Sequence, residues 1–283
     1  MSILVSALFI YPIKSAAGIP VSELELDDLG AVNDRRWMLV DNNDRFITQR
    51  EAGSLALIGV QVSAQGLVLR NSRMEALSVD VPHADFPRRS VIVWDDSVLV
   101  QDAGDTAAAW CSQAIGMQCR LVHIARDAER PLQHKYAGSV NPLGRHVALS
   151  DGAPLLLLSE ASLATLNDRL VSKDISSLGW DRFRPSVVLS GADSHAEDTW
   201  HSIEINGVEI GVGSPCPRCV ITTIDQTRGE RSPSREGEPG GEPLRTLATY
   251  RRQGTGVMFG MNATNATPGI IRVGDEVVVK SLR

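Results

Sequence analysis

Two cysteines separated by a proline and an arginine are the residues of this chain best suited to chemistry. They lie in the stretch Ser214-Pro215-Cys216-Pro217-Arg218-Cys219-Val220-Ile221-Thr222-Thr223. A strongly predicted hairpin precedes this stretch and a β-branched run opens within it, so we expect both thiols where a loop joins a strand. A thiolate at such a place is held firmly and stays accessible to a ligand.

A Cys-x-x-Cys spacing is compatible with several chemistries. Thioredoxin-like exchange places the motif at the start of a helix, and the β-branched residues 220–223 are poor helix formers. A four-cysteine zinc site lacks a good second pair, because Cys111 and Cys119 are too widely spaced. Two buried structural thiols would leave Arg218 without a partner in an apolar core. A single soft thiolate ligand to a metal fits best, with Arg218 lowering the pKa of the thiol and attracting an anionic partner.

The elements that position this motif are predicted to be mostly short strands. Over residues 46–100 such strands alternate with polar turns, which is typical of a small barrel or sandwich, and one hairpin has its turn at 95–97. A second hairpin, over 203–210, has an Asn-Gly type I′ turn and leads directly to the cysteines. A third is predicted over 271–279, with a Gly-Asp turn.

Helices are predicted at three places only. Asp105 caps a helix that ends at Gly116, and Ser159 caps a second helix whose leucines share one face. A third helix lies around Leu244. The fold class predicted is therefore α+β, predominantly β, and the polar, turn-rich residues 126–141 are expected to join two halves.

The cysteine motif resembles that of the MOSC domain, in the branch that includes the mitochondrial amidoxime-reducing component and its bacterial relatives. The resemblance implies that Cys219 is the catalytic residue and the protein ligand to molybdenum. It also implies that Pro217 and Arg218 line the cofactor, which in this family is Mo-molybdopterin.

The N-terminal motif Tyr11-Pro12-Ile13-Lys14-Ser15 is similar to a second signature of this family. On its own, the pair of Lys14 and Ser15 would be a solvated lysine beside a turn serine. The resemblance implies instead that both contact the cofactor phosphate. Arg35 matches a further cofactor-contacting arginine, and Asp34 is expected to orient it through a bidentate pair.

Four more residues match the family in later segments. Gly152 and Ala153 match a loop that binds the pterin through backbone groups. Arg184 matches the arginine of a Phe-Arg-Pro motif that reaches the cofactor, whereas we expect Arg182 to be a surface neighbour. Asn262 stands where the family places another contact, although the residue type there varies.

The resemblance spans nearly the whole chain and implies two domains. Residues 1–125 are expected to form an N-terminal MOSC-associated β-barrel domain. Residues 126–283 are expected to form a MOSC β-barrel domain with a few peripheral helices. Residues 226–242, rich in Pro, Gly, Ser and Arg, are predicted to form a mobile flap that controls access to the metal.

Composition narrows the choice of partners. The chain has 283 residues, a formal net charge of −6, a pI near 5.5 and four cysteines. These values argue against nucleic acid or an anionic membrane as the main partner, and free thiols fit the cytoplasm. A ferredoxin-type cysteine cluster and a dinucleotide fingerprint are both absent from the sequence, so we expect electrons from a separate protein, a reductase with a ferredoxin-like or cytochrome component.

The function implied by the resemblance is two-electron reduction of N-hydroxylated compounds such as amidoximes, hydroxylamines and N-oxides, with oxygen transferred to the metal. Convergence of four cations from separate segments, Lys14, Arg35, Arg184 and Arg218, supports an anionic ligand. The alternative is a module that carries the cofactor or delivers sulfur without turning over a substrate.

Overall fold

The chain folds mainly into strands, as predicted, in a computed structural model that describes residues 2–231 and 241–283. Within this part the only α helices are the three at the places expected, α1 (Asp105–Ile115), α2 (Glu160–Val171) and α3 (Leu244–Ala248). Ser159 accepts a hydrogen bond from the backbone amide of Ser162 and so caps α2 as predicted, whereas Asp105 is the first residue of α1 and Gly104 is its N-cap. Gly116 ends α1 in the left-handed conformation.

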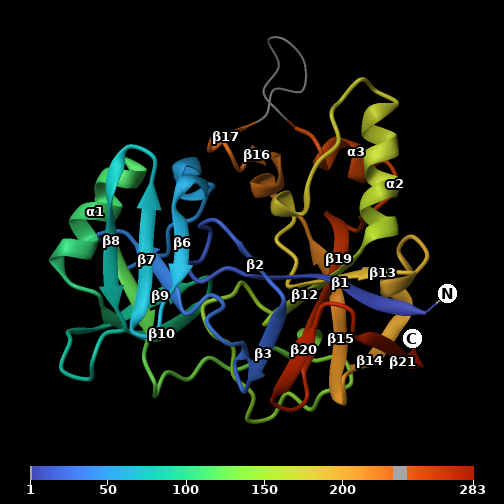
Figure 1. Cartoon of the computed structure of the whole chain (residues 1–283), viewed down its shortest axis with the longest axis horizontal. Helices are drawn as coiled ribbons and strands as arrows, with labels where there is room; N and C mark the ends of the chain where they lie inside the picture. Colours follow the sequence, from blue (N-terminus) through green and yellow to red (C-terminus); the bar gives the residue numbers. More distant parts are fainter. Residues whose placement is uncertain (1, 232–240) are drawn as a thin grey trace.

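Seven strands form a closed barrel, seen on the right in Figure 1. Each strand pairs with the next and the last pairs again with the first, in the order β12 (Leu155–Ser159), β13 (Val187–Ser190), β1 (Ile3–Ile10), β21 (Glu276–Leu282), β14 (Trp200–Ile205), β15 (Val208–Pro217) and β19 (Gly256–Asn265). The core contains fully buried aliphatic side chains such as Leu157, Ile203 and Ile210. Closure gives each of these seven strands a hydrogen-bonded neighbour on both sides.

The N-terminal half forms a half-barrel, on the left in Figure 1. One antiparallel sheet has the order β5 (Trp37–Val40), β11 (Arg120–Ile124), β10 (Asp96–Asp102) and β9 (Arg88–Val93). A second contains β6 (Gly59–Val62), β7 (Gly66–Asn71) and β8 (Met74–Asp80). Helix α1 packs against them through Ala107 and Cys111, and Trp37 lies in the same core, as expected.

The strands nearest the start of the chain pair with strands from the C-terminal half. Strand β1 is a barrel strand between β13 and β21, although it belongs to the N-terminal half of the sequence. The short strands that follow, β2 (Ile19–Val21), β3 (Glu23–Asp27) and β4 (Gly30–Ala31), pair with β1, with one another or with β20 (Gly269–Arg272). A domain boundary at residues 125 and 126 stays a prediction.

Two of the three predicted hairpins have the expected pairing. Strands β14 and β15 are joined by Asn206 and Gly207 with φ of 48° and 76°, which a type I′ turn requires. Strands β9 and β10 also pair, but their turn residues are Trp94 and Asp95 rather than 95–97. The prediction for 271–279 was wrong, because β20 pairs with β3 while β21 pairs with β1 and β14.

The region after the cysteines also differs from the expectation. Residues Val220–Thr223 form a turn of 3-10 helix, and the strand begins only at Ile224 in β16 (Ile224–Asp225), which pairs with β17 (Glu230–Arg231). Local hydrogen bonds from the Thr222 and Thr223 hydroxyls to preceding carbonyls explain this outcome for a β-branched run. The predicted flap falls partly on 232–240, which lie outside the described residues.

A remaining pair, β18 (Arg252–Gln253) with β19, completes the strands. None of the helices within residues 2–231 and 241–283 has the length and hydropathy of a membrane span.

Candidate cofactor site

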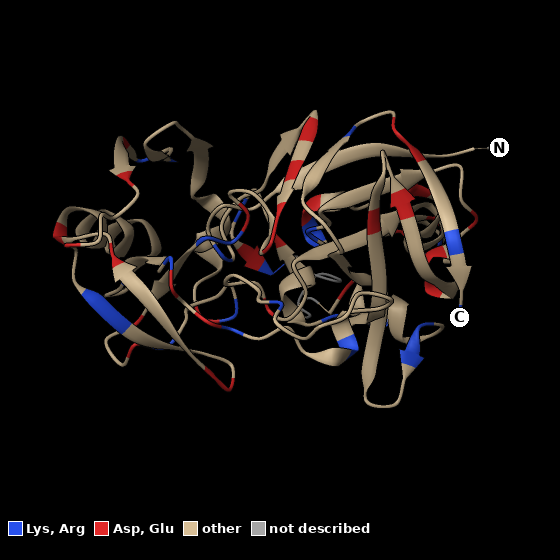
Figure 2. Ribbon diagram, turned by 90° about the horizontal axis from the view of Figure 1, so that it is seen from below, with Lys and Arg blue, Asp and Glu red and all other residues tan. Residues whose placement is uncertain are grey.

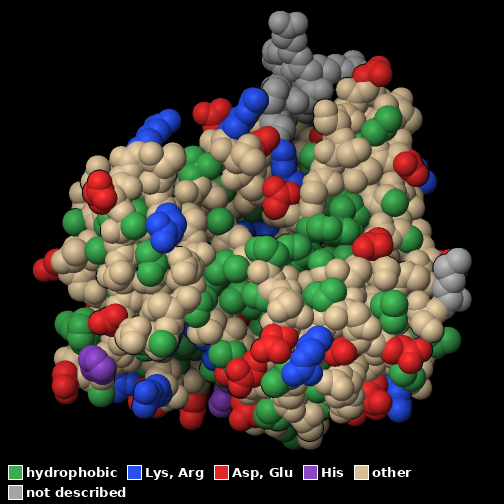
Figure 3. All heavy atoms as spheres, in the orientation of Figure 1, with side chains coloured by type: hydrophobic (Ala, Val, Ile, Leu, Met, Phe, Trp, Pro, Cys, Tyr) green, Lys and Arg blue, Asp and Glu red, His purple; other side chains and the backbone are tan. Residues whose placement is uncertain are grey.

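All ten residues that the sequence singled out line one cleft at the rim of the barrel. Strands β1 and β15 end there, and β12 and β13 begin there. Figure 2 shows several Lys and Arg segments in the middle of the molecule, where the two halves meet, and Figure 3 shows a hollow with apolar side chains around it on that part of the surface. The predicted residues in the cleft are Lys14, Ser15, Arg35, Gly152, Ala153, Arg184, Pro217, Arg218, Cys219 and Asn262.

The two cysteines are free thiols, and each has a different arginine against its sulfur. Nη1 of Arg218 lies 3.1 Å from Sγ of Cys216, and Nη2 of Arg50 lies 3.1 Å from Sγ of Cys219. The expectation that Arg218 acts on the Cys219 thiol is therefore corrected. The cation at Cys219 comes from the N-terminal half instead.

Lys14 is buried, not solvated, with only 4% of its surface exposed. Its ammonium donates to the carbonyl of Leu149 at 2.8 Å and to the carboxylate of Asp151. Burial lowers the pKa of Lys14, and the charge of Asp151 partly offsets this. Burial alone would raise the pKa of Asp151, but Lys14 and a hydrogen bond from Trp94 hold it well below its usual range.

Two guanidinium groups stack on one buried tyrosine. The Cζ atoms of Arg35 and Arg184 lie 4.4 Å and 4.1 Å from the centre of the Tyr11 ring. Asp34 orients Arg35 as predicted, but through one oxygen at 2.6 Å, since its other oxygen accepts from the Tyr11 amide at 2.7 Å. Burial, and then the charge of Arg35, lower the pKa of Arg184 to about 10.

Three of the predicted residues have a strained backbone. Ser15, Arg35 and Arg184 have φ of 67°, 46° and 57°, in the left-handed region that residues with a side chain seldom adopt. Each costs on the order of 1 kcal/mol or more, and such residues gather at ligand sites. Their concentration in one cleft indicates that the fold sacrifices local stability to aim these side chains.

Arg130 holds the loop before β12 in place, a role that was not predicted from the sequence. Its buried guanidinium donates to the carbonyls of Ala148, Ser150 and Asp151 and pairs with Asp96. Gly152 packs so closely that a Cβ there would lie 2.3 Å from the Tyr136 ring. Nothing in the polar segment around Arg130 distinguishes it from the exposed arginines.

Two further contacts hold the cysteine segment. Asn262 in β19 donates from Nδ2 to the Ser214 carbonyl at 3.1 Å. Arg182 was expected on the surface, but only 6% of it is exposed. It lies 3.4 Å from both the Thr222 carbonyl and the Asp225 carboxylate, because the 3-10 turn after Cys219 folds back over it.

The donor set of the cleft fits an anionic ligand with several acceptor atoms. Four cations, Lys14, Arg35, Arg184 and Arg218, face it, while Asp34 and Asp151 are the carboxylates paired with them. Nη2 of Arg184, Nε of Arg218 and Oγ of Ser150 are buried there without a hydrogen-bond partner in the described residues. Unpaired buried donors are costly, so they favour a ligand with oxygen or sulfur acceptors.

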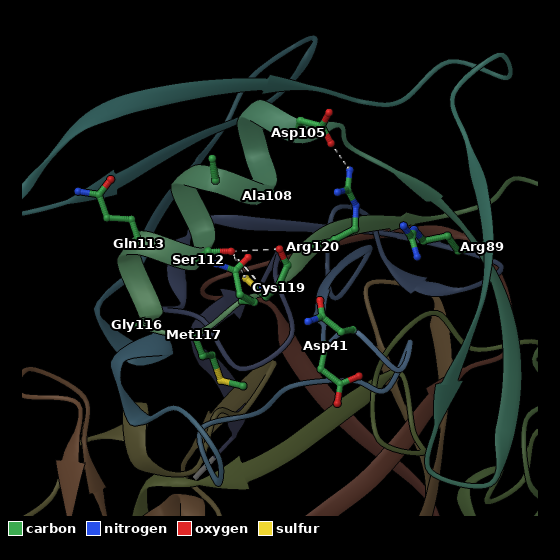
Figure 4. A pocket seen from close by; sticks show the side chains of 13 residues that line it. Asp41, Arg89, Asp105, Ala108, Ser112, Gln113, Gly116, Met117, Cys119 and Arg120 are labelled. Carbon is green, nitrogen blue, oxygen red and sulfur yellow. Dashed lines mark hydrogen bonds and ion pairs between the residues drawn. The ribbon is translucent and has the colours of Figure 1, made fainter.

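A second, larger pocket lies beside α1 in the N-terminal half (Figure 4). Its cations are already neutralised, because Arg89 and Arg120 both donate to Asp102, and Arg120 also reaches Asp105 at 2.9 Å. Burial raises the pKa of the Cys119 thiol, which keeps it unreactive. None of the ten predicted residues lies in this pocket.

Comparison with known proteins agrees with this architecture. Residues 2–118 match the MOSC N-terminal beta barrel domain, and residues 144–278 match the MOSC domain. Mitochondrial amidoxime-reducing component 1 is 34% identical in Mus musculus and 33% identical in Homo sapiens, each over 96% of this chain and 81% and 82% of the relative. The chain therefore belongs to the family that joins an N-terminal MOSC β-barrel to a MOSC domain and that includes the mitochondrial amidoxime-reducing components.

Proposed function

We propose that this protein is a molybdenum cofactor-dependent reductase of N-hydroxylated compounds, namely amidoximes, hydroxylamines and N-oxides. The observation that carries the proposal is the half-buried Cys219 thiol at a cleft whose cations outnumber its carboxylates. Family membership supports it, because the relatives are named for amidoxime reduction.

The residues of the cleft suggest how Mo-molybdopterin would be held. Lys14, Ser15, Arg35 and Arg184 would bind its phosphate, since they supply cations and a hydroxyl from three segments. The backbone at Gly152 and Ala153 would bind the pterin, with Pro217, Arg218 and Asn262 beside it. Cys219 would be the thiolate ligand, a donor that suits a soft metal. The bound cofactor would supply the two-electron redox chemistry.

The protein itself contributes position and charge. Arg130 and Arg182 fix the two loops that border the cleft, and the Tyr11 ring fixes the planes of Arg35 and Arg184. Side chains held this way need little rearrangement when a ligand arrives, so binding costs less conformational entropy. The surplus positive charge of the cleft would retain an anionic ligand beside Cys219.

Exchange of each cysteine tests the proposal. Cys219→Ala is expected to abolish reduction of an amidoxime by protein loaded with cofactor, whereas Cys216→Ala is expected to keep much of it. The measurement is turnover with reduced methyl viologen, together with molybdenum content. Equal loss in both variants, with a Cys216–Cys219 disulfide forming during the active cycle, would instead support dithiol exchange.

A carrier or sulfur-delivery role is the second candidate. It is favoured by the Cys216 thiol, which is partly exposed and has Nη1 of Arg218 at 3.1 Å. A carrier would bind the cofactor and transfer it or its sulfur to another protein without consuming amidoxime. Turnover that depends on an N-hydroxylated substrate separates the two roles.

For electron supply we propose a separate donor protein, a reductase with a ferredoxin-like or cytochrome component. The relatives are named as components, which agrees with a system of several proteins. A cytoplasmic location is proposed on the basis that all four cysteines are unpaired.

A further inference from the structure

Arg50 is the one residue of the N-terminal half-barrel whose side chain contacts the Cys219 sulfur by a hydrogen bond in the described structure. Its Nη2 lies 3.1 Å from Sγ, and its Nη1 lies 3.4 Å from the Thr48 hydroxyl. The centre of the Trp94 ring is 5.0 Å from its Cζ. The guanidinium is thus fixed on two sides and directed at the sulfur.

Arg50 has no carboxylate within ion-pair distance in the described structure, and Asp151 interacts with its charge only from farther away. Among the described residues no ion pair within 4.0 Å involves it, in contrast to Lys14 with Asp151 and Arg35 with Asp34. An arginine held without a counter-ion beside a reactive group is a favourable place for an anion.

Arg50 contacts Cys219 beside residues that are exposed to solvent. It is not among the residues that line the cleft with the four other cations. Its neighbours are open to water, because Trp94 is 43% exposed and the Asp151 side chain 59% exposed. The part of the Trp94 ring that is exposed beside Arg50 is therefore accessible to a molecule arriving from solvent.

The turn that carries Arg50 is locked to the segment that follows the cysteines. Gln49 and Gln226 exchange two side-chain hydrogen bonds of 2.9 Å, and Gln49 also donates to the Ser15 carbonyl at 2.7 Å. Gly53 lies so near Gly229 that a Cβ would approach its carbonyl oxygen to 2.1 Å. The position of Arg50 relative to Cys219 is therefore built into the fold and does not depend on one flexible side chain.

We propose that Arg50 determines substrate specificity by binding an anionic group of the substrate beside Cys219, while Trp94 flanks a planar substituent. This deepens the reductase assignment and rests on it. The preferred substrates would be aromatic N-hydroxylated compounds that carry a carboxylate. A guanidinium to carboxylate contact gives both charge and direction, and the exposed part of the Trp94 ring, which Arg50 and Phe46 also contact, can flank an aromatic ring.

Kinetics with a matched pair of substrates, neutral benzamidoxime and its para-carboxylate derivative, test the proposal. Arg50→Gln is expected to raise KM for the carboxylate derivative about tenfold or more, as loss of a charge-assisted contact implies. For neutral benzamidoxime KM should change less than about twofold, whereas kcat should change by the same factor for both substrates, because Arg50 also contacts the Cys219 sulfur. Arg50→Lys should recover part of the loss. Arg73→Gln, which removes the same charge at an exposed turn, is the control and should match the wild type.

A second readout uses the full chain made without cofactor and does not depend on reductase activity. The ratio of the alkylation rates of Cys219 by anionic iodoacetate and neutral iodoacetamide reports the local charge, because both reactions use the same thiolate. Trypsin separates the two thiols, since cleavage after Arg218 and Arg228 releases Cys219 in the peptide 219–228. Arg50→Gln should lower this ratio about fivefold, and Arg73→Gln should leave it unchanged.

The outcomes separate failure of this inference from failure of the reductase assignment. An unchanged alkylation ratio in Arg50→Gln would overturn the local charge effect, whatever the enzyme does. A molybdenum content that falls in Arg50→Gln, with equal KM changes for both amidoximes, would place Arg50 on the cofactor and overturn its role in specificity. A lowered ratio in a protein that reduces neither amidoxime would support the anion site and remove the reductase assignment.

Discussion

Replacement of Arg184 by methionine should have little effect on the unloaded protein. The variant loses the hydrogen bond from Nη1 to the Ala16 carbonyl at 2.6 Å and the stacking on Tyr11, together about 2–4 kcal/mol. It also removes a cation that has no ion-pair partner in the described ranges, and desolvation of such a charge costs several kcal/mol. The lowered pKa of Arg184, caused chiefly by burial, reflects this cost. The free energy of unfolding should therefore change by less than about 1 kcal/mol.

The same substitution should strongly weaken cofactor binding. Nη2 of Arg184 is buried without a partner in the described residues, so an acceptor oxygen of the ligand would gain its full hydrogen bond there. A charge-assisted contact contributes about 1.5–3 kcal/mol, which corresponds to a loss of about tenfold to a hundredfold in affinity. The assay is molybdenum and pterin content after gel filtration of protein produced in a host that makes the cofactor.

Arg182→Met is the matched control, two residues away. Arg182 is more deeply buried, but its charge faces the Asp225 carboxylate and the Thr222 carbonyl. Its loss should lower the free energy of unfolding of the unloaded protein by about 2 kcal/mol. Wild-type molybdenum content in Arg184→Met would refute the argument that its unpaired donor exists for the ligand, and so would a destabilisation equal to that of Arg182→Met.

Three other outcomes follow from the same structure. Lys14→Met should clearly lower molybdenum content but change the free energy of unfolding little, because its partner Asp151 can stay hydrated. Equal molybdenum content in mutant and wild type would contradict this. Burial lowers the pKa of His123 from 6.5 to about 4. Between these two pH values the unfolded chain binds more protons than the folded chain, so the free energy of unfolding falls as the pH falls. His123→Leu should reduce the slope of unfolding free energy against pH by up to about 1.4 kcal/mol per pH unit, measured by chemical denaturation. Purified protein with NADH alone should not reduce an amidoxime, whereas added reductase and ferredoxin-like or cytochrome protein should restore turnover; efficient NADH-driven turnover would contradict the separate donor.

The sequence correctly predicted the elements that depend on residues close together in the chain. The Asn206-Gly207 turn and the Ser159 cap depend on residues within a few positions, and both are present as expected. The 271–279 hairpin failed because pairing of its strands is decided by β1, β3 and β14, which are distant in sequence. A turn sequence determines where the chain changes direction, but it does not determine which strands pair with each other.

The ten candidate site residues were predicted through motifs, and the structure brings all ten together. Their supporting residues were missed for a physical reason. Arg130 and Arg182 lie in polar, turn-rich sequence, where an arginine is usually exposed. Only the fold decides that loop carbonyls surround one guanidinium and that the 3-10 turn covers the other.

Residues from the N-terminal half of the chain complete the site, because β1 is one of the strands that close the barrel. Strand β1 lies between β13 and β21, so Lys14, four residues beyond the end of β1, reaches the rim of the barrel. Arg50 then reaches the Cys219 sulfur only if the half-barrel is docked against the cysteine segment, as the contact between Gln49 and Gln226 requires. Substitutions that loosen this docking, such as Gly53→Val, should therefore change the environment of Cys219 although they lie far from it in sequence.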